Sequence, residues 1–134
     1  MTSIKDTGRP EPFILVVEDD PSLLENLEDI LQFAGYDFVA VSNAYEGFNV
    51  LRSVSRLPDL IISNILMPGM DGFQFLLAVR KNRSWANIPF LFISGQEATC
   101  FVQDAAYGAV AYMTKPFEVS ELLDLVGRML VEDS

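Results

Sequence analysis

The residues best suited to chemistry in this sequence are two adjacent carboxylates, an amide, a hydroxyl and an ammonium group. They are Glu18, Asp19, Asn64, Ser94 and Lys115. Two adjacent carboxylates resist joint ionisation unless a cation offsets their charge. A hard divalent ion such as Mg²⁺, bound by one or two carboxylates and by water, suits that acidic pair. The ammonium and hydroxyl groups would stabilise a small oxyanion beside the ion, so the sequence predicts an oxyanion site next to a metal.

These groups lie together only if the apolar runs that precede them are parallel strands of one sheet. The sequence predicts strands at 13–17, 37–41, 60–63, 89–93 and 110–113. Apolar residues at helical spacing predict helices at 21–34, 44–54, 71–80, 98–106 and 119–130. This alternation indicates an α/β domain in which right-handed crossovers join the strands of a parallel sheet. Polar residues at the carboxyl ends of the strands then share the edge where such sheets bind ligands.

Helix starts are marked by residues that accept backbone N–H groups. Asp20 before Pro21 predicts the cap of the first helix, and Asp71 predicts that of the third. Asn43 with Glu46 three residues later resembles a capping box for the second. The strand at 60–63 is apolar without alternation, which predicts helices over both faces of the sheet.

Composition limits the classes of function. The 134 residues contain 9 Lys and Arg, 19 Asp and Glu and no His, a formal net charge of −10. This charge argues against binding nucleic acid or anionic membranes, and the absence of His excludes imidazole chemistry. Residues 1–12 are polar and predict a flexible extension to a domain at 13–131, and Cys100 is expected to be a small core residue. No apolar run approaches a membrane span, so we expect a cytoplasmic protein.

Four motifs, in this order and spacing, resemble the receiver domain of two-component response regulators of the chemotaxis-regulator type. They are ILVVEDD, PDLIISNILMPGMDG, FISG and AYMTKPF. The resemblance covers nearly the whole chain from residue 13. It implies a flavodoxin-like (βα)5 three-layer sandwich with strand order 2-1-3-4-5. It also implies a signalling domain and not an enzyme, partnered by a sensor histidine kinase or histidine phosphotransfer protein.

The resemblance also assigns a metal site. It implies that Glu18 and Asp19 are the acidic pair for Mg²⁺, completed by Asn64 and by the backbone carbonyl of Leu66.

Other residues would contact the phosphoryl group or respond to it. By the same resemblance, Lys115 contacts the phosphoryl group, and Pro116 follows it in a cis peptide bond. Ser94 is the switch hydroxyl, and Tyr112 is the aromatic residue that changes rotamer with it.

The sequence departs from the family at its centre, because Asn64 stands where the family has the phosphoacceptor Asp. A carboxylate can attack phosphorus, whereas a neutral amide cannot do so usefully. The lost charge also predicts weak Mg²⁺ binding. Two origins fit: an engineered substitution that holds an ordinary receiver unphosphorylated, or a natural pseudo-receiver. Retention of the other four polar residues favours the first.

Three other functions remain open at this stage. A flavin carrier needs a Ser-, Thr- or Gly-rich phosphate cradle after the first strand, where this chain has acidic residues. A metal-dependent phosphohydrolase would have to use Asp19 as its nucleophile. A phosphorylation-independent interaction domain would bind its effector through the face formed by 98–106, 110–113 and 119–130. Ala109, Val110 and Ala111 lie where receivers that dimerise through this face tend to be acidic, so we expect a monomer.

Overall fold

The computed structural model of the chain describes residues 11–95 and 110–132. Five parallel strands form one sheet in the order β2-β1-β3-β4-β5. The strands are β1 (Phe13–Val17), β2 (Asp37–Val41), β3 (Leu60–Asn64), β4 (Phe90–Ser94) and β5 (Val110–Thr114). The helices are α1 (Pro21–Ala34), α2 (Ala44–Ser53), α3 (Gly72–Lys81) and α4 (Val119–Glu132).

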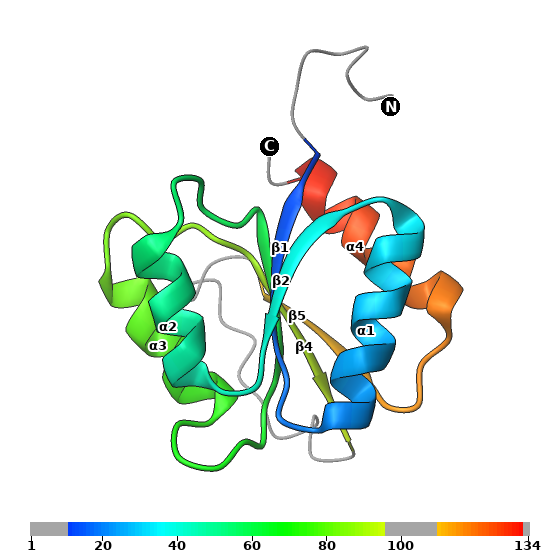
Figure 1. Cartoon of the computed structure of the whole chain (residues 1–134), viewed down its shortest axis with the longest axis horizontal. Helices are drawn as coiled ribbons and strands as arrows, with labels where there is room; N and C mark the ends of the chain where they lie inside the picture. The colour runs from blue at the N-terminus through cyan, green and yellow to red at the C-terminus, as the bar shows by residue number, and fades with distance from the viewer. Residues whose placement is uncertain (1–10, 96–109, 133–134) are drawn as a thin grey trace.

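The helices cover the sheet on both faces. In Figure 1, α1 and α4 lie on one side of the sheet, and α2 and α3 lie on the other. The predicted α/β three-layer architecture and strand order are confirmed. The expected helix over 98–106 lies outside the described residues.

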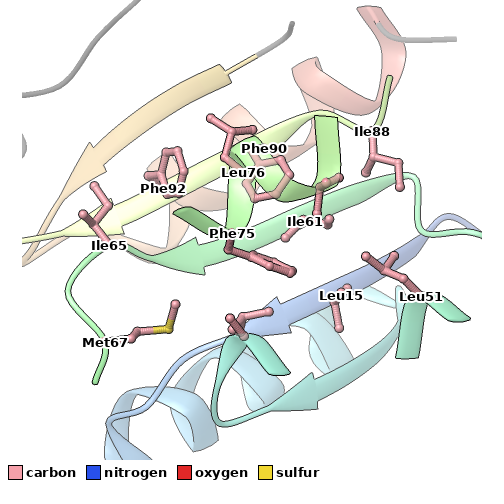
Figure 2. Close-up of a cluster of buried hydrophobic side chains, with 13 residues drawn as sticks. Leu15, Leu51, Ile61, Ile65, Met67, Phe75, Leu76, Ile88, Phe90 and Phe92 are labelled. Atoms are coloured by element: carbon pink, nitrogen blue, oxygen red, sulfur yellow. The ribbon is translucent and has the colours of Figure 1, made fainter. Parts of the chain in front are cut away.

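The three central strands are buried along their whole length. Every residue of β1, β3 and β4 is buried, because helices cover both faces of each strand. Leu15 and Val17 point into one apolar cluster, whereas Ile14 and Val16 point into another. Figure 2 shows the first cluster, in which Phe75 of α3 packs against the sheet. Its ring meets that of Phe90 edge-on at a centroid distance of 5.7 Å.

Predicted capping residues begin the first and third helices. Asp20 accepts from the Ser22 N–H at 3.0 Å, and Gly35 ends α1 with a left-handed φ of 89°. A reciprocal capping box begins α3: Asp71 Oδ1 accepts from the Gln74 N–H, and Gln74 Oε1 accepts from the Asp71 N–H.

The predicted capping box at α2 is only half formed. Asn43 Oδ1 accepts from the Glu46 N–H at 2.9 Å, as expected. Glu46 does not return the bond to Asn43. Its Oε1 atom accepts from both the N–H and the hydroxyl of Ser42, since Ser42 offers two donors in reach of one carboxylate.

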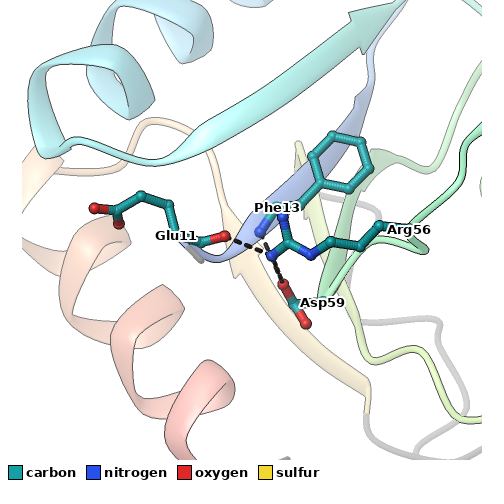
Figure 3. Close-up of polar contacts among 4 residues, drawn as sticks. All are labelled: Glu11, Phe13, Arg56 and Asp59. Carbon is teal, nitrogen blue, oxygen red and sulfur yellow. Dashed lines mark hydrogen bonds and ion pairs between the residues drawn. The ribbon is translucent and has the colours of Figure 1, made fainter. Parts of the chain in front are cut away.

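A polar cluster lies at the amino ends of β1 and β3. The carboxyl ends of these strands, with Glu18 and Asn64, are on the opposite side of the sheet. Arg56 Nη2 donates to the Glu11 carbonyl and to Asp59 Oδ2, which also accepts from the Phe13 N–H at 2.8 Å. Figure 3 shows the Arg56 side chain crossing between these partners. Of the expected extension, residues 1–10 lie outside the described residues.

None of the helices in the described part of the chain is long and apolar enough to cross a lipid bilayer.

Candidate functional site

The candidate site lies at the carboxyl edge of β1 and β3. These two strands pair in parallel, with Val17 opposite Ser63. Glu18 and Asp19 follow Val17 directly, so the pairing brings both carboxylates beside Asn64, the last residue of β3. The structure therefore brings together three residues that are separated by up to 46 positions in the sequence.

The side-chain amide of Asn64 is the centre of this group. Its Nδ2 atom donates to Glu18 Oε2 at 3.1 Å, to Asp19 Oδ1 at 3.0 Å and to the Leu66 carbonyl at 3.2 Å. Its Oδ1 atom accepts from the Ile65 N–H at 2.8 Å. Three acceptors surround the nitrogen and one donor faces the oxygen, so the partners fix which way the amide points.

The Glu18 carboxyl is almost completely inaccessible to water. It is 1% exposed, and this burial raises its pKa from 4.5 to about 7. The Asp20 N–H, which donates to Oε2 at 3.0 Å, and the charge of Lys115 oppose that rise in pKa. Neighbouring Asp19 adds to the rise. The Glu18 pKa therefore reports a buried carboxyl whose charge is only partly compensated by this chain's own groups.

The loop after β3 is held close to the site by α3. The Gly72 N–H donates to the Ile65 carbonyl at 2.7 Å, which ties the first residue of α3 to the residue after Asn64. Leu66 is 58% exposed, whereas Ile65 and Met67 on either side of it are buried. Burial of these two apolar neighbours fixes the loop so that the Leu66 carbonyl faces the Asn64 amide.

Ser94 and Lys115 approach the same edge from β4 and β5. The Lys115 N–H donates to the Ser94 carbonyl at 2.7 Å, and the Lys115–Pro116 peptide bond is cis. The Ser94 side chain is 1% exposed, and its Oγ has no hydrogen-bond partner within the described residues. An unbonded buried hydroxyl is costly, which makes Ser94 a group that can still bind an acceptor.

Tyr112 lies in the middle of β5 and packs against the first apolar cluster. Its ring stacks on Phe92 with centroids 5.8 Å apart and an interplanar angle of 21°. Burial raises the pKa of the Tyr112 hydroxyl. The structure shows this packing contact, and the predicted change of rotamer remains a prediction.

The residues present match a Mg²⁺ site in part. The oxygens of Glu18, Asp19 and Leu66 converge on one point, and all three are the hard ligands that Mg²⁺ prefers. At that point, however, lies the Asn64 nitrogen, which is a donor and cannot ligate a cation. Among residues 11–95 and 110–132, no group of three or more His, Cys, Asp or Glu side chains is arranged to hold a metal.

Sequence reasoning missed two features that shape this site. It did not predict that the Asn64 nitrogen would face the acids, which depends on where the Ile65 N–H and the Leu66 carbonyl lie. It also assigned no role to Gly72. Glycine is a weak helix former, so its presence at the first position of a helix was a signal that a side chain does not fit there.

Comparisons with known proteins agree with this fold. A family model for the response regulator receiver domain matches residues 14–127. Response regulator protein FleR of Pseudomonas aeruginosa is 40% identical over 116 residues, which are 86% of this chain and 24% of FleR. Response regulator Rre1 of Synechocystis is 33% identical over 120 residues, or 87% of this chain and 51% of Rre1. The chain thus spans about a quarter and about half of these relatives.

Solved structures give the same result. Chemotaxis protein CheY4 of Vibrio cholerae superposes with a TM-score of 0.80 at 29% identity, covering 90% of this chain and 99% of CheY4. The signal receiver domain of a histidine kinase from Syntrophus aciditrophicus superposes with a TM-score of 0.76 at 31% identity, covering 90% and 91%. The chain belongs to the response regulator receiver domain family of two-component signalling.

Proposed function

We propose that this chain is a receiver domain that keeps its phosphoryl pocket but accepts no phosphoryl group at residue 64. One observation carries the proposal: the Asn64 amide lies at the end of β3, bonded to both Glu18 and Asp19. A carboxylate at that place would be a nucleophile toward phosphorus, whereas the amide nitrogen has its lone pair delocalised and its hydrogens engaged.

The rest of the pocket supports the proposal. The buried Ser94 hydroxyl is unbonded within the described residues, and the Lys115 charge opposes the rise in the Glu18 pKa that burial causes. A hydroxyl donor and a fixed positive charge at one edge suit the oxygens of a phosphoryl group. We assign Ser94 and Lys115 these contacts, and Tyr112 the aromatic position that responds to Ser94.

The partners we propose follow from the family. Receiver domains of response regulators act with histidine kinases and effector domains, so we propose a sensor histidine kinase or a histidine phosphotransfer protein as the upstream partner. The effector would bind the face that includes β5 and α4, and the domain would act as a monomer. We propose no catalytic turnover: incubation with a phosphoester and Mg²⁺ is expected to release no phosphate.

The direct test restores the carboxylate. Asn64→Asp, incubated with acetyl phosphate and Mg²⁺ or with a cognate kinase, is expected to gain one labile phosphate, which intact-mass measurement detects. Asn43→Asp is the matched control, because it makes the same change at the cap of α2, and it should gain none. A phosphate on the unchanged chain, or none on a folded Asn64→Asp protein, would overturn the proposal.

A second function has its own support. The Asn64 amide has every polar atom hydrogen bonded, so this residue needs no phosphoryl group to satisfy it. A natural pseudo-receiver that binds its partner without phosphorylation would have this property, as would an engineered substitution. The genomic coding sequence separates them: an Asp codon for residue 64 means engineering, and an Asn codon means a natural pseudo-receiver.

A further inference from the structure

We propose that the amide nitrogen of Asn64 takes the place of the metal ion, so that this domain closes its acidic site without any divalent cation. The inference rests on the proposed function, since it concerns the same pocket. It goes further than the proposed function in one respect. The loss of the carboxylate charge would only weaken metal binding, whereas we propose that the amide also occupies the position of the metal.

The first support is the position of one atom. Asn64 Nδ2 lies 3.0–3.2 Å from three oxygens contributed by Glu18, Asp19 and Leu66. An ion bound by the same three oxygens would have to lie at about 2.1 Å from each of them for Mg²⁺. The amide nitrogen and an ion therefore compete for one small volume.

The second support is that the amide cannot simply turn over. Rotation by 180° would bring Oδ1 against the Glu18 and Asp19 carboxylates and the Leu66 carbonyl, which are acceptors. The same rotation would place Nδ2 against the Ile65 N–H, which now donates to Oδ1 at 2.8 Å. Without an ion, four favourable contacts would be replaced by repulsive ones, and with an ion in place the Nδ2 and Ile65 N–H donors would still oppose each other. An ion therefore gains entry only at the expense of the amide network.

The third support is burial. Asn64 is 8% exposed and Glu18 is 1% exposed, so water has little access to the carboxylate oxygen that the amide binds. A buried carboxylate needs a donor or a cation at hand. In this chain the Asn64 amide and the Asp20 N–H both donate to Glu18 Oε2. These two donors supply part of the stabilisation that a bound cation would otherwise give the carboxylate.

The decisive experiment separates blocking from loss of charge. Asn64→Ala has the same net charge as the unchanged chain but has no amide, whereas Asn64→Asp restores the charge. Thermal unfolding of all three is followed in EDTA and in 10 mM MgCl₂, and Mg²⁺ affinity is measured by calorimetry. Asn43→Ala, which removes the amide that caps α2, is the control for loss of an asparagine hydrogen bond alone.

We expect Mg²⁺ to shift the melting temperature of the unchanged chain and of Asn43→Ala by no more than about 1 °C. In Asn64→Ala and Asn64→Asp it should raise the melting temperature by about 4 °C or more. The dissociation constant for Mg²⁺ should be at least about tenfold lower in Asn64→Ala than in the unchanged chain, because the volume is free. An Asn64→Ala protein that binds Mg²⁺ no better than the unchanged chain would overturn the proposal.

A spectroscopic measurement on the unchanged chain gives an independent reading. The side-chain ¹⁵N–¹H₂ signals of Asn64 should stay in place when Mg²⁺ is added, whereas movement of both signals at millimolar Mg²⁺ would contradict the inference. Failure here is distinguishable from failure of the proposed function. Suppose that Asn64→Asp takes up phosphate but the unchanged chain binds Mg²⁺ as tightly as Asn64→Ala. The receiver assignment would then stand, and the proposal that the amide takes the place of the metal would be wrong.

Discussion

Gly72 lies so close to Asn64 that a Cβ atom at residue 72 would be 2.3 Å from the Asn64 carbonyl oxygen and 2.9 Å from the Ile65 Cα. Both neighbours are backbone atoms at the end of a buried strand, so they cannot move aside as a flexible side chain would. Contact between the start of α3 and the end of β3 therefore requires glycine, and this contact positions the loop that contributes the Leu66 carbonyl.

Gly72→Ala is accordingly expected to lower the free energy of unfolding by about 3 kcal/mol through overpacking. Gly127→Ala in α4 is the matched control, because its added Cβ would meet nothing within 4 Å. That change should raise the free energy of unfolding by about 0.5–1 kcal/mol through helix propensity. Urea denaturation of both variants provides the measurement. Equal effects at the two positions would show that the close approach at Gly72 is unimportant.

Replacing the unbonded hydroxyl of Ser94 should not destabilise the protein. Ser94→Ala removes a buried group without a hydrogen-bond partner in the described residues, so the free energy of unfolding should stay the same or rise by about 1 kcal/mol. Ser63→Ala is the matched comparison. Ser63 Oγ donates to the Asn64 carbonyl at 2.7 Å, and its loss should cost about 1 kcal/mol. A Ser94→Ala protein clearly less stable than Ser63→Ala would contradict this assignment.

Stability without metal should depend on pH through Glu18. Its pKa is about 7 in the folded chain and near the ordinary 4.5 in the unfolded chain, so the folded state holds a proton that the unfolded state has released. The free energy of unfolding should then fall as pH rises from 4.5 to 7, by at most about 1.4 kcal/mol per pH unit from this group. Below pH 4.5 this contribution is constant.

Glu18→Gln tests the source of that dependence. Denaturation in EDTA between pH 4.5 and 8 should show a flatter profile for Glu18→Gln than for the unchanged chain, since glutamine does not titrate. The difference between the two profiles isolates Glu18 from other carboxyl groups. Parallel profiles across this range would mean that burial of the carboxyl does not raise its pKa.

At the opposite edge of the sheet, Asp59 should matter more than Arg56. Asp59→Ala leaves the N–H of buried Phe13 without its acceptor, which should cost about 1–2 kcal/mol. Arg56→Ala removes a half-exposed ion pair and should cost below about 1 kcal/mol. Hydrogen exchange at the Phe13 amide provides a local measurement. It should accelerate far more in Asp59→Ala, and the reverse order would show that the ion pair dominates.

The fold was predictable because its signals are local and repeated. Apolar runs of strand length alternate with helical spacing, and Asp20, Gly35 and Asp71 mark helix ends by chemistry that acts within a few residues. Strand ends were less predictable. Asn64 and Ser94 were expected just beyond their strands, but each pairs within the ladder, because backbone pairing continues past the last apolar side chain.

The meeting of Glu18, Asp19 and Asn64 was predictable from the sequence, and the geometry of their contacts was not. Topology alone brings Glu18, Asp19 and Asn64 to one edge once the strands are parallel. The direction of the Asn64 amide depends on the Ile65 N–H and on the Leu66 carbonyl, two backbone groups whose positions no residue type reveals. The same limit explains Glu46, whose bond to Ser42 depended on the local path of the chain.

The double-sided burial of β1 has a consequence for how that strand finds its place. Apolar side chains project from both faces of β1 into the two apolar clusters. A shift of the strand by one residue would therefore exchange Leu15 and Val16 between these clusters at little hydrophobic cost. The residue after the strand makes such a shift unfavourable. The shift would move the Glu18 carboxylate into the hydrogen-bonded ladder or away from Asn64. The Glu18 carboxyl group at the end of β1 thus also helps to fix the register of β1 against β3.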